Sequence, residues 1–270
     1  MGAVARLTPR PAVKRELQVG VAPAAELLPL RARFREEMNC QIVHDSIHRR
    51  EGWAVCYRLG TVEHPVGFGT VAIGGPWAGK PTVYEFWVVP EERVRLFDWF
   101  EAFLEAAHPS HFEVQTNEPQ LAVLLHAYGR HFESEKIVFR DGAQTQLPAH
   151  GARVRGLTSA EEIRRALANR QGGGEWVLEL DGQRIASGGV LFHYNVPYGD
   201  VYMEVDAGFR RRGFGSYLVQ ELKRECYALG AIPAARCNPG NIGSRTTLQR
   251  AGFVPSGHIV NATIDWPRTH

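Results

Sequence analysis

The spacing of apolar residues predicts alternating helices and strands along the first half of the chain. Leu27, Leu30, Phe34 and Met38 recur every three or four residues, which predicts one or two helices between Leu27 and about Ile47. Runs rich in aromatic and β-branched residues predict strands. The other elements expected in this half are strands at Trp53–Leu59, Val66–Ile73, Val83–Val89, Phe112–Thr116 and Lys136–Phe139, and helices at about Leu96–Ala107 and Gln120–Tyr128.

The pattern begins again after a stretch without periodicity at Asp141–Gly151, which is expected to be a linker. Thr158 and Glu161 have the spacing of a capping box and predict the start of a helix. Asp181-Gly182 between two apolar runs predicts a hairpin. The elements expected here are strands at Trp176–Leu180, Ile185–Phe192, Val201–Val205, Ile232–Cys237 and Phe253 to about Ile264, and helices at about Thr158–Leu167, Phe214–Leu229 and Ser244–Arg250.

Both halves therefore show helix, three strands, helix, strand, helix, strand, which suggests an internal duplication. A shift of 117 residues places Phe97 on Phe214, although few residues match. We expect an α/β chain of the α+β type with two similar domains, each a mixed, mostly antiparallel sheet flanked by helices. The expected divisions are a flexible arm at 1–16, a first domain at 17–147 and a second at 148–270.

Composition narrows the class of protein. Hydrophobic residues make up 44% of the chain and charged residues 22%, as in soluble globular proteins. The net charge of +2 gives no basic footprint for nucleic acid, which only the short runs at 210–212 and 223–224 would favour. No apolar run approaches the ~18 residues of a membrane helix. Four widely spaced cysteines suggest a reducing compartment, so a cytoplasmic protein is expected.

The most informative stretch is 205–216, between a predicted strand and a long predicted helix. Gly213 and Gly215 let the backbone turn tightly and bring several N–H groups together at the positive end of a helix, which favours a pyrophosphate. The arginines at 210–212 add charge and forked donors. A dinucleotide fingerprint would need Gly or Ala where Leu218 stands, and the Walker Gly-Lys-Ser/Thr is missing.

This stretch resembles motif A of the GCN5-related N-acetyltransferase (GNAT) superfamily, whose pattern is Arg/Gln-x-x-Gly-x-Gly/Ala. Arg210, Gly213 and Gly215 fill that pattern. The resemblance is specific over roughly Val201–Phe253, and the element order extends it over most of the second half. A resemblance to motif B is carried by Asn241, Ser244 and the run 249–253.

The resemblance implies that acyl-CoA, with acetyl-CoA as the expected cosubstrate and no metal, lies where Val201–Val205 and Ile232–Cys237 splay apart. Backbone at Val205 would pair with the pantetheine arm and polarise the thioester. An acceptor amine would attack the thioester directly, without a covalent enzyme intermediate. The cofactor-binding residues implied are Val205, Arg210, Arg211, Arg212, Gly213, Phe214, Gly215, Ser216, Asn241 and Ser244.

Two proton transfers accompany this reaction. An alkylammonium with a pKa near ~10.4 is only about one part in a thousand free amine at pH 7, so a base helps. Glu204 is the candidate base, and Asp200 is the alternative. The family commonly protonates the leaving thiolate with a motif-B Tyr, but Leu248 stands at that position. The replacements weighed here are Tyr202, Cys237, Ser244 and water.

The first half resembles the family in element order only. Leu96 and Asp98 stand where the second half has Gly213 and Gly215, and a carboxylate there would repel a pyrophosphate. We therefore expect a degenerate copy that does not bind the cofactor and that supplies a wall of the acceptor pocket or a dimer surface.

Within the first half, Cys40, His44 and His48 recur at i, i+4 and i+8 in the region predicted as helix, which would place them on one face. No further ligand with suitable spacing accompanies them, so pocket lining or packing is expected rather than a metal site.

The function expected is N-acetyl transfer from acetyl-CoA to a small-molecule or peptide amine, by a cytoplasmic enzyme that could form a homodimer. No nucleic acid or membrane partner is expected. The alternative is a non-catalytic acyl-CoA-binding regulatory protein, which the missing motif-B Tyr keeps open. The sequence does not identify the acceptor, because the fold does not fix the substrate.

Overall fold

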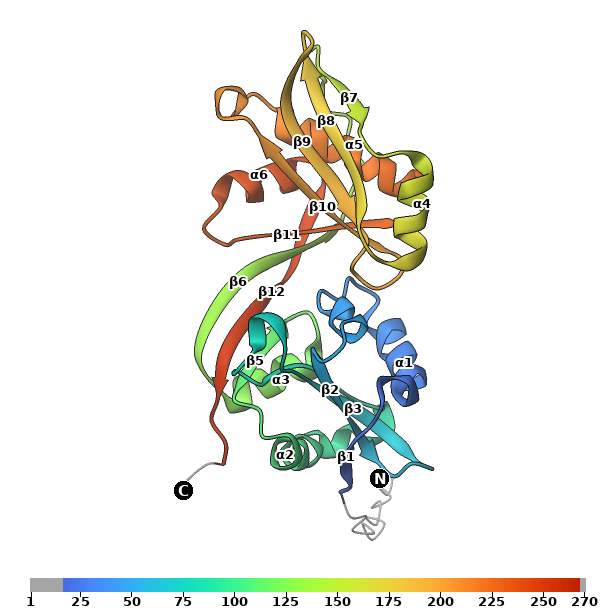
Figure 1. Ribbon diagram of the computed structural model, residues 1–270. Coiled ribbons are helices and arrows are strands. Elements are labelled where there is room, and N and C mark those ends of the chain that lie inside the picture. Colours follow the sequence, from blue (N-terminus) through green and yellow to red (C-terminus); the bar gives the residue numbers. More distant parts are fainter. Residues whose placement is uncertain (1–16, 268–270) are drawn as a thin grey trace, which may run out of the picture.

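The structure, a computed structural model, describes residues 17–267, so the arm expected at 1–16 lies outside the described residues. The two halves repeat one order of elements, as predicted, and each begins with one further short strand (Figure 1). The first half contains β1 (Val19–Val21), α1 (Leu28–Met38), β2 (Ala54–Gly60), β3 (Pro65–Ala72), β4 (Thr82–Val88), α2 (Leu96–Ala107), β5 (His111–Gln115), α3 (Pro119–Tyr128) and β6 (Gly129–Asp141). The second half contains β7 (Arg153–Gly156), α4 (Ala160–Asn169), β8 (Gly173–Leu180), β9 (Gln183–Leu191), β10 (Tyr198–Val205), α5 (Phe214–Ala228), β11 (Ile232–Cys237), α6 (Ile242–Arg250) and β12 (Phe253–Ile264).

The predicted helical region 27–47 is wrong in its second part. α1 ends at Met38 because Asn39 adopts a left-handed conformation with φ of 43°, which stops the helix. The chain then runs irregularly until a short 3-10 helix at Asp45–Arg49. Cys40, His44 and His48 therefore do not share a helix face.

The capping box of α4 lies one residue later than predicted. The Ser159 hydroxyl accepts from the Glu162 N–H, and the Glu162 carboxylate accepts from the Ser159 N–H at 3.0 Å. Both pairs, Thr158/Glu161 and Ser159/Glu162, have the required spacing in the sequence. The structure uses the second pair and leaves the Thr158 hydroxyl to accept from the Glu175 N–H at 3.0 Å.

All the strands within residues 17–267 join in one sheet of 12 strands, in the order β1-β2-β3-β4-β5-β12-β6-β11-β10-β9-β8-β7. Only β4–β5 and β10–β11 pair in parallel among the described strands, so each half contributes a mixed, mostly antiparallel part, as predicted. The two parts are continuous because the halves exchange their last strands. β6 of the first half pairs with β11, and β12 of the second half pairs with β5 (Figure 1).

The exchange explains why β6 is longer than the predicted strand at 136–139. The end of β6 beyond Lys136 pairs with β11, where Ile137 lies opposite Cys237. The whole length of β6 also lies against β12. β6 belongs to the first half of the sequence and pairs with β11 of the second half. β12 belongs to the second half and pairs with β5 of the first half.

The pairing of β10 with β11 is short. It covers Tyr198 with Ile232, Gly199 with Pro233 and Asp200 with Ala234. Beyond Asp200 the other edge of β10 stays paired with β9 as far as Val205, while β11 continues along β6. The stretch Val201–Val205 therefore has a free edge that faces a gap in the sheet.

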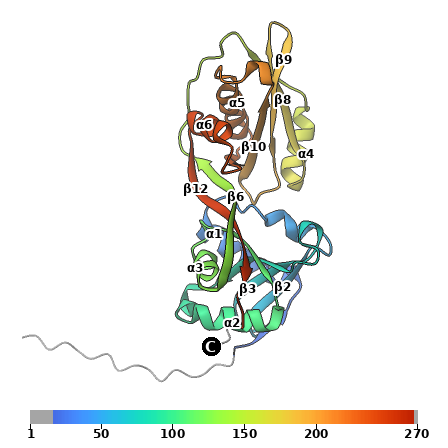
Figure 2. The same cartoon turned by 90° about the vertical axis from the view of Figure 1, so that its left-hand side faces the viewer.

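α5 and α6 lie together on one side of the second half (Figure 2). α4 packs into the same core as α5, through Ile163, Ala166 and Leu167. Val201, Met203 and Val205 pack with the core under α5. Because side chains alternate along a strand, Asp200, Tyr202 and Glu204 point to the opposite face.

Candidate functional site

The turn between β10 and α5 depends on two left-handed residues. Arg211 has φ of 62° and Gly213 has φ of 87°, and Gly213 is the N-cap of α5. The first i to i−4 bond of the helix runs from the Tyr217 N–H to the Gly213 carbonyl at 3.0 Å. The N–H groups at 214–216 thus have no partner within the helix, and N–H groups left unpaired at the positive end of a helix favour an anion.

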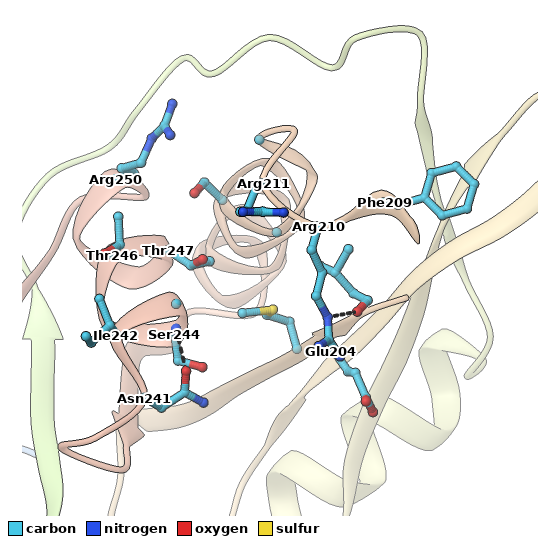
Figure 3. A pocket seen from close by; sticks show the side chains of 16 residues that line it. Glu204, Phe209, Arg210, Arg211, Asn241, Ile242, Ser244, Thr246, Thr247 and Arg250 are labelled. Carbon is cyan, nitrogen blue, oxygen red and sulfur yellow. Dashed lines mark hydrogen bonds between the residues drawn. The ribbon is translucent and has the colours of Figure 1, made fainter. Parts of the chain in front are cut away.

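Arg210 fixes this loop to the strand before it. Its Nε donates to the Val205 carbonyl at 2.9 Å, across the end of β10 (Figure 3). The guanidinium is thereby held beside the start of α5 with donors left for a ligand, since five N–H groups belong to each arginine.

A cavity of about 720 Å³ lies beside this loop and reaches the free edge of β10 and the start of α6. This volume is within the range of ligand pockets. Figure 3 shows Arg210 and Glu204 on the β10 side and Asn241, Ser244 and Thr247 on the α6 side. The lining residues are Met203, Glu204, Val205, Phe209, Arg210, Arg211, Gly213, Gly215, Ser216, Asn241, Ile242, Gly243, Ser244, Thr246, Thr247 and Arg250.

Gly215 allows the walls of the cavity to approach one another. A Cβ on Gly215 would lie 3.2 Å from Val205 Cγ2 and 3.3 Å from Thr247 Cγ2, so β10 and α6 would both have to yield. Gly213 is needed for its left-handed backbone, which strains most other residues.

Asn241 has a structural function as well as a place in the cavity. Its Oδ1 accepts from the Ser244 N–H at 2.9 Å and caps α6. Figure 3 shows this capped first turn of α6, with Asn241 and Ser244, beside the cavity.

The structure brings together most of the predicted cofactor residues: Val205, Arg210, Arg211, Gly213, Gly215, Ser216, Asn241 and Ser244 all line the cavity. Arg212 and Phe214 are outside this lining. The Arg212 guanidinium lies over the rings of Phe209 and Phe214, at 5.6 and 5.2 Å from their centroids, and Phe214 is a core residue.

The predicted catalytic residues fall in different places. Glu204 lines the cavity. Tyr202 is 41% exposed on the same face of β10, outside the lining, and burial together with the charge of Glu175 raises the pKa of its phenol. Cys237 is buried at the end of β11, and this burial raises the pKa of its thiol. Leu248, at the usual Tyr position, is a core residue.

Several lining residues were not predicted from the sequence. Gly243, Thr247 and Arg250 stand at i, i+4 and i+7 on α6, so helical spacing from Gly243 would have found them. The other unpredicted lining residues are Met203, Phe209, Ile242 and Thr246.

The equivalent gap in the first half is filled. β4 and β5 pair at only two positions, Thr82 with His111 and Val83 with Phe112, and then separate. Gln120 of α3 reaches across: its Oε1 accepts from the Val88 N–H at 3.0 Å and its Nε2 donates to the Val88 carbonyl at 3.3 Å. Val88 corresponds to Val205 at the shift of 117 residues, so both polar backbone groups at this position are already paired.

Residues 17–267 contain no group of three or more His, Cys, Asp or Glu side chains that could hold a metal ion. Among the helices in this part of the chain, none is long and apolar enough to cross a membrane.

The fold and site define an α/β protein of two similar halves, with a phosphate-type loop beside parted strands. Residues 144–253 match the model of the acetyltransferase (GNAT) family. This part of the chain therefore resembles the acetyltransferase domain of GNAT proteins, a family of acyltransferases. A search of curated protein sequences finds no match.

Solved structures resemble most of the chain. A GNAT-family acetyltransferase from Colwellia psychrerythraea has a TM-score of 0.66 and 14% identity, over 92% of this chain and 99% of its own. A tandem GNAT protein from the clavulanic acid biosynthesis pathway has a TM-score of 0.60 and 14% identity, over 94% and 100%. A GCN5-related N-acetyltransferase from Sphaerobacter thermophilus has a TM-score of 0.58 and 14% identity, over 94% of this chain and 98% of its own. At these identities the likeness concerns the fold.

Proposed function

We propose that this protein transfers an acetyl group from acetyl-CoA to an amine acceptor, and that the cavity beside Gly213 holds the cofactor. One observation carries the proposal. A helix start with unpaired N–H groups, flanked by Arg210 and Arg211, opens onto the free edge of β10. The first feature suits a pyrophosphate and the second suits the extended amide arm that follows it in CoA.

The loop would bind the pyrophosphate through the N–H groups at 214–216. Arg210, Arg211 and Arg250 all line the cavity and supply fixed positive charge to balance the phosphates. Because the helix dipole and the arginines act together, the loop would bind the diphosphate more strongly than either alone.

The pantetheine arm would pair with the free edge of Val201–Val205, which places the thioester in the gap between β10 and β11. The acceptor would approach from the opposite face, where Glu204 and Tyr202 point. Glu204 is the proposed group that attracts the ammonium and takes its proton, and Tyr202 is a proposed proton donor to the thiolate. Cys237 points to the α5–α6 face and is the weaker donor.

We also propose that each chain binds one cofactor, in the second half only. Gln120 already pairs with the backbone that a pantetheine arm would need in the first half. At the start of α2, Arg95 already lies beside two carboxylates of the protein. Its Nη1 is 3.9 Å from Glu92 Oε2, and its Nε is 3.5 Å from Asp98 Oδ2.

The test is thermal unfolding with CoA or acetyl-CoA, on wild type and on Gly213→Asp/Gly215→Asp. Ligand at a hundred times Kd should stabilise wild type by about 2.7 kcal/mol, and the double variant should show no shift. Gly208→Asp is the matched control, because Gly208 stands in the same loop outside the lining and its Cβ would meet nothing within 4 Å. No stabilisation of folded wild type would refute the proposal.

Calorimetry tests the stoichiometry. Wild type should bind one CoA per chain, and Gln120→Ala should leave that number unchanged. Two sites in wild type would refute the assignment to one half.

One observation favours a second function, acyl-CoA binding without catalysis. Leu248 is buried in the core, so α6 presents no phenol to the cavity. Release of free thiol over many turnovers with an amine present would decide for the enzyme, while stabilisation by CoA without such release would favour a binding protein.

A further inference from the structure

The loop between β9 and β10 lies on the acceptor face, where β10 and β11 begin to part. Its His193 contacts Asp200, with 3.2 Å between Nε2 and Oδ2. Asp200 belongs to the last β10–β11 pair. Arg236, two residues past the other member of that pair, places Nη2 3.5 Å from the same Asp200 oxygen. These three side chains surround the entrance to the gap on the side opposite α5 and α6.

The first half of the chain holds this loop in place. Asn195 is buried, its Oδ1 accepts from the Ile42 N–H at 2.6 Å, and its Nδ2 donates to the Cys40 carbonyl at 3.1 Å. Arg49 Nη2 donates to the His193 carbonyl at 2.9 Å. The loop that carries His193 is therefore attached to residues about 150 positions earlier in the chain.

The holding segment is itself fixed. The Gln115 side chain accepts from the Val43 N–H at 3.0 Å and donates to the Gln41 carbonyl at 2.7 Å. The Gln41 side chain donates to the Phe139 carbonyl on β6 at 2.8 Å. A continuous set of hydrogen bonds thus runs from the exchanged strand through segment 40–43 to the loop.

Charges of both signs surround this entrance. Asp200 is buried, and Arg236 offsets its charge. Burial opposes a charged Arg236, but Tyr194, Asp200 and two further carboxylates raise the pKa of its guanidinium. Asp200 is therefore the carboxylate beside His193 that an ammonium group entering the gap would meet.

We infer that the acceptor site is shared by the two halves: the ammonium acceptor contacts His193, and Asn195 and Arg49 are positioning residues that hold the His193 loop against the first half. The inference rests on the proposed acyl transfer and assigns its acceptor site. Such a site would give the first half a part in the reaction without a second cofactor.

The experiment measures amine-dependent thiol release by the full-length protein, using the best primary amine from a screen, for wild type, His193→Ala, Asn195→Leu and Arg49→Met. Each variant should lower kcat/KM for the amine at least tenfold, while KM for acetyl-CoA and thermal stabilisation by CoA stay within twofold of wild type. Asn195→Asp should be intermediate, because it keeps the acceptor for the Ile42 N–H and loses the donor to the Cys40 carbonyl. Asn169→Leu, on the exposed end of α4, is the matched control and should behave as wild type.

If Asn195→Leu fails to fold, Arg49→Met provides the test. Arg49 lies where the first half meets the His193 loop, and its side chain is 30% exposed. Equal losses for the amine and for acetyl-CoA would show a general structural effect and overturn the inference. So would variants whose kcat/KM for the amine stays within twofold of wild type. Wild type that is stabilised by CoA but releases no thiol with any amine would overturn both the shared site and the proposed transfer. If only the shared site is wrong, the variants will release thiol with the amine as wild type does, and the proposed acetyl transfer will stand.

Discussion

The two halves differ at one matching helix position beside the gap in the sheet. The second position of α6 is Gly243, which lines the cavity, while the second position of α3 is Gln120, which crosses the equivalent gap and pairs with Val88. The helices and strands around both positions follow the same order. In the first half, the side-chain amide of Gln120 thus pairs with the strand edge at Val88. In the second half, the equivalent edge of β10 is where an extended ligand would pair.

Glu204→Gln tests the proposed proton acceptor. The substitution keeps the size of the side chain and removes its charge, so amine-dependent thiol release should fall about 10²–10⁴-fold, the usual effect of a general base. Stabilisation by CoA should not change, because the loop and its arginines are untouched. The measurement is kcat with saturating acetyl-CoA. Retention of more than half the wild-type kcat would eliminate Glu204 as the base.

Glu118 is a second carboxylate with a testable effect, in this case on stability. It is 3% exposed, and within residues 17–267 its Oε1 has no hydrogen-bond partner. Burial, and then the charges of Glu85 and Glu37, raise its pKa well above the ordinary value. The folded protein therefore keeps the proton on Glu118, while the unfolded chain loses it above about pH 4.3. As the pH rises from there to the raised pKa of the folded protein, this group lowers the free energy of unfolding.

Glu118→Gln removes this dependence. Relative to wild type, the variant should gain stability between pH 5 and pH 8, by up to about 1.4 kcal/mol for each pH unit below the folded pKa. Urea unfolding of both proteins at the two pH values measures the change. Glu105→Gln, at an exposed position of α2, is the control and should show no such trend. A constant difference between wild type and Glu118→Gln across this range would contradict the raised pKa.

At the scale of elements, local patterns predicted most helices and strands but not their partners. The long helix α5 and the turn at Gly213 followed from apolar spacing and glycine chemistry, which act within a few residues. The error after Met38 arose because the helical spacing of Leu27, Leu30, Phe34 and Met38 was extended beyond Asn39, which ends the helix. The exchange of β6 and β12 depends on contacts more than a hundred residues apart, which no local pattern contains.

The lining of the cavity at the start of α5 could be predicted because it depends on neighbouring residues: Arg210, Gly213 and Gly215 stand together in the sequence. The proposed acceptor side gathers His193, Asp200 and segment 40–49 from distant parts of the chain. Arg212 was predicted beside the phosphates, but it packs over two phenylalanine rings, a competition that depends on tertiary structure.

The exchange predicts which fragment of the second half can fold. A fragment of residues 148–270 lacks β6, which lies between β11 and β12 in the sheet. It should therefore fail to fold. A fragment of residues 129–270 restores β6 and the continuous order from β7 to β12, and it should be stabilised by CoA. Circular dichroism and thermal unfolding with CoA compare the two. Equal stabilisation of both fragments would contradict a structural role for β6.

At the scale of the whole molecule, the shared sheet makes the halves one cooperative unit. β12 is bonded to β5 on one side and β6 on the other, so neither half can lose its last strand without disrupting the other. Ligand binding in the second half should therefore stabilise the first half as well, although the first half would not touch the cofactor.

The tryptophans allow this coupling to be measured. Of the six, only Trp176 is in the core under α5; the others are Trp53, Trp77, Trp87 and Trp99 in the first half and Trp266, which packs against Tyr128 of the first half. In Trp176→Phe, fluorescence therefore reports on the first half alone. With CoA at a hundred times Kd, its transition should rise by the same number of degrees as that measured by circular dichroism, because the full stabilisation of about 2.7 kcal/mol reaches both halves. The same comparison in Gly213→Asp/Gly215→Asp/Trp176→Phe is the control and should show no rise. A first-half transition that CoA leaves unmoved, while circular dichroism shifts, would mean that the halves unfold separately despite the common sheet.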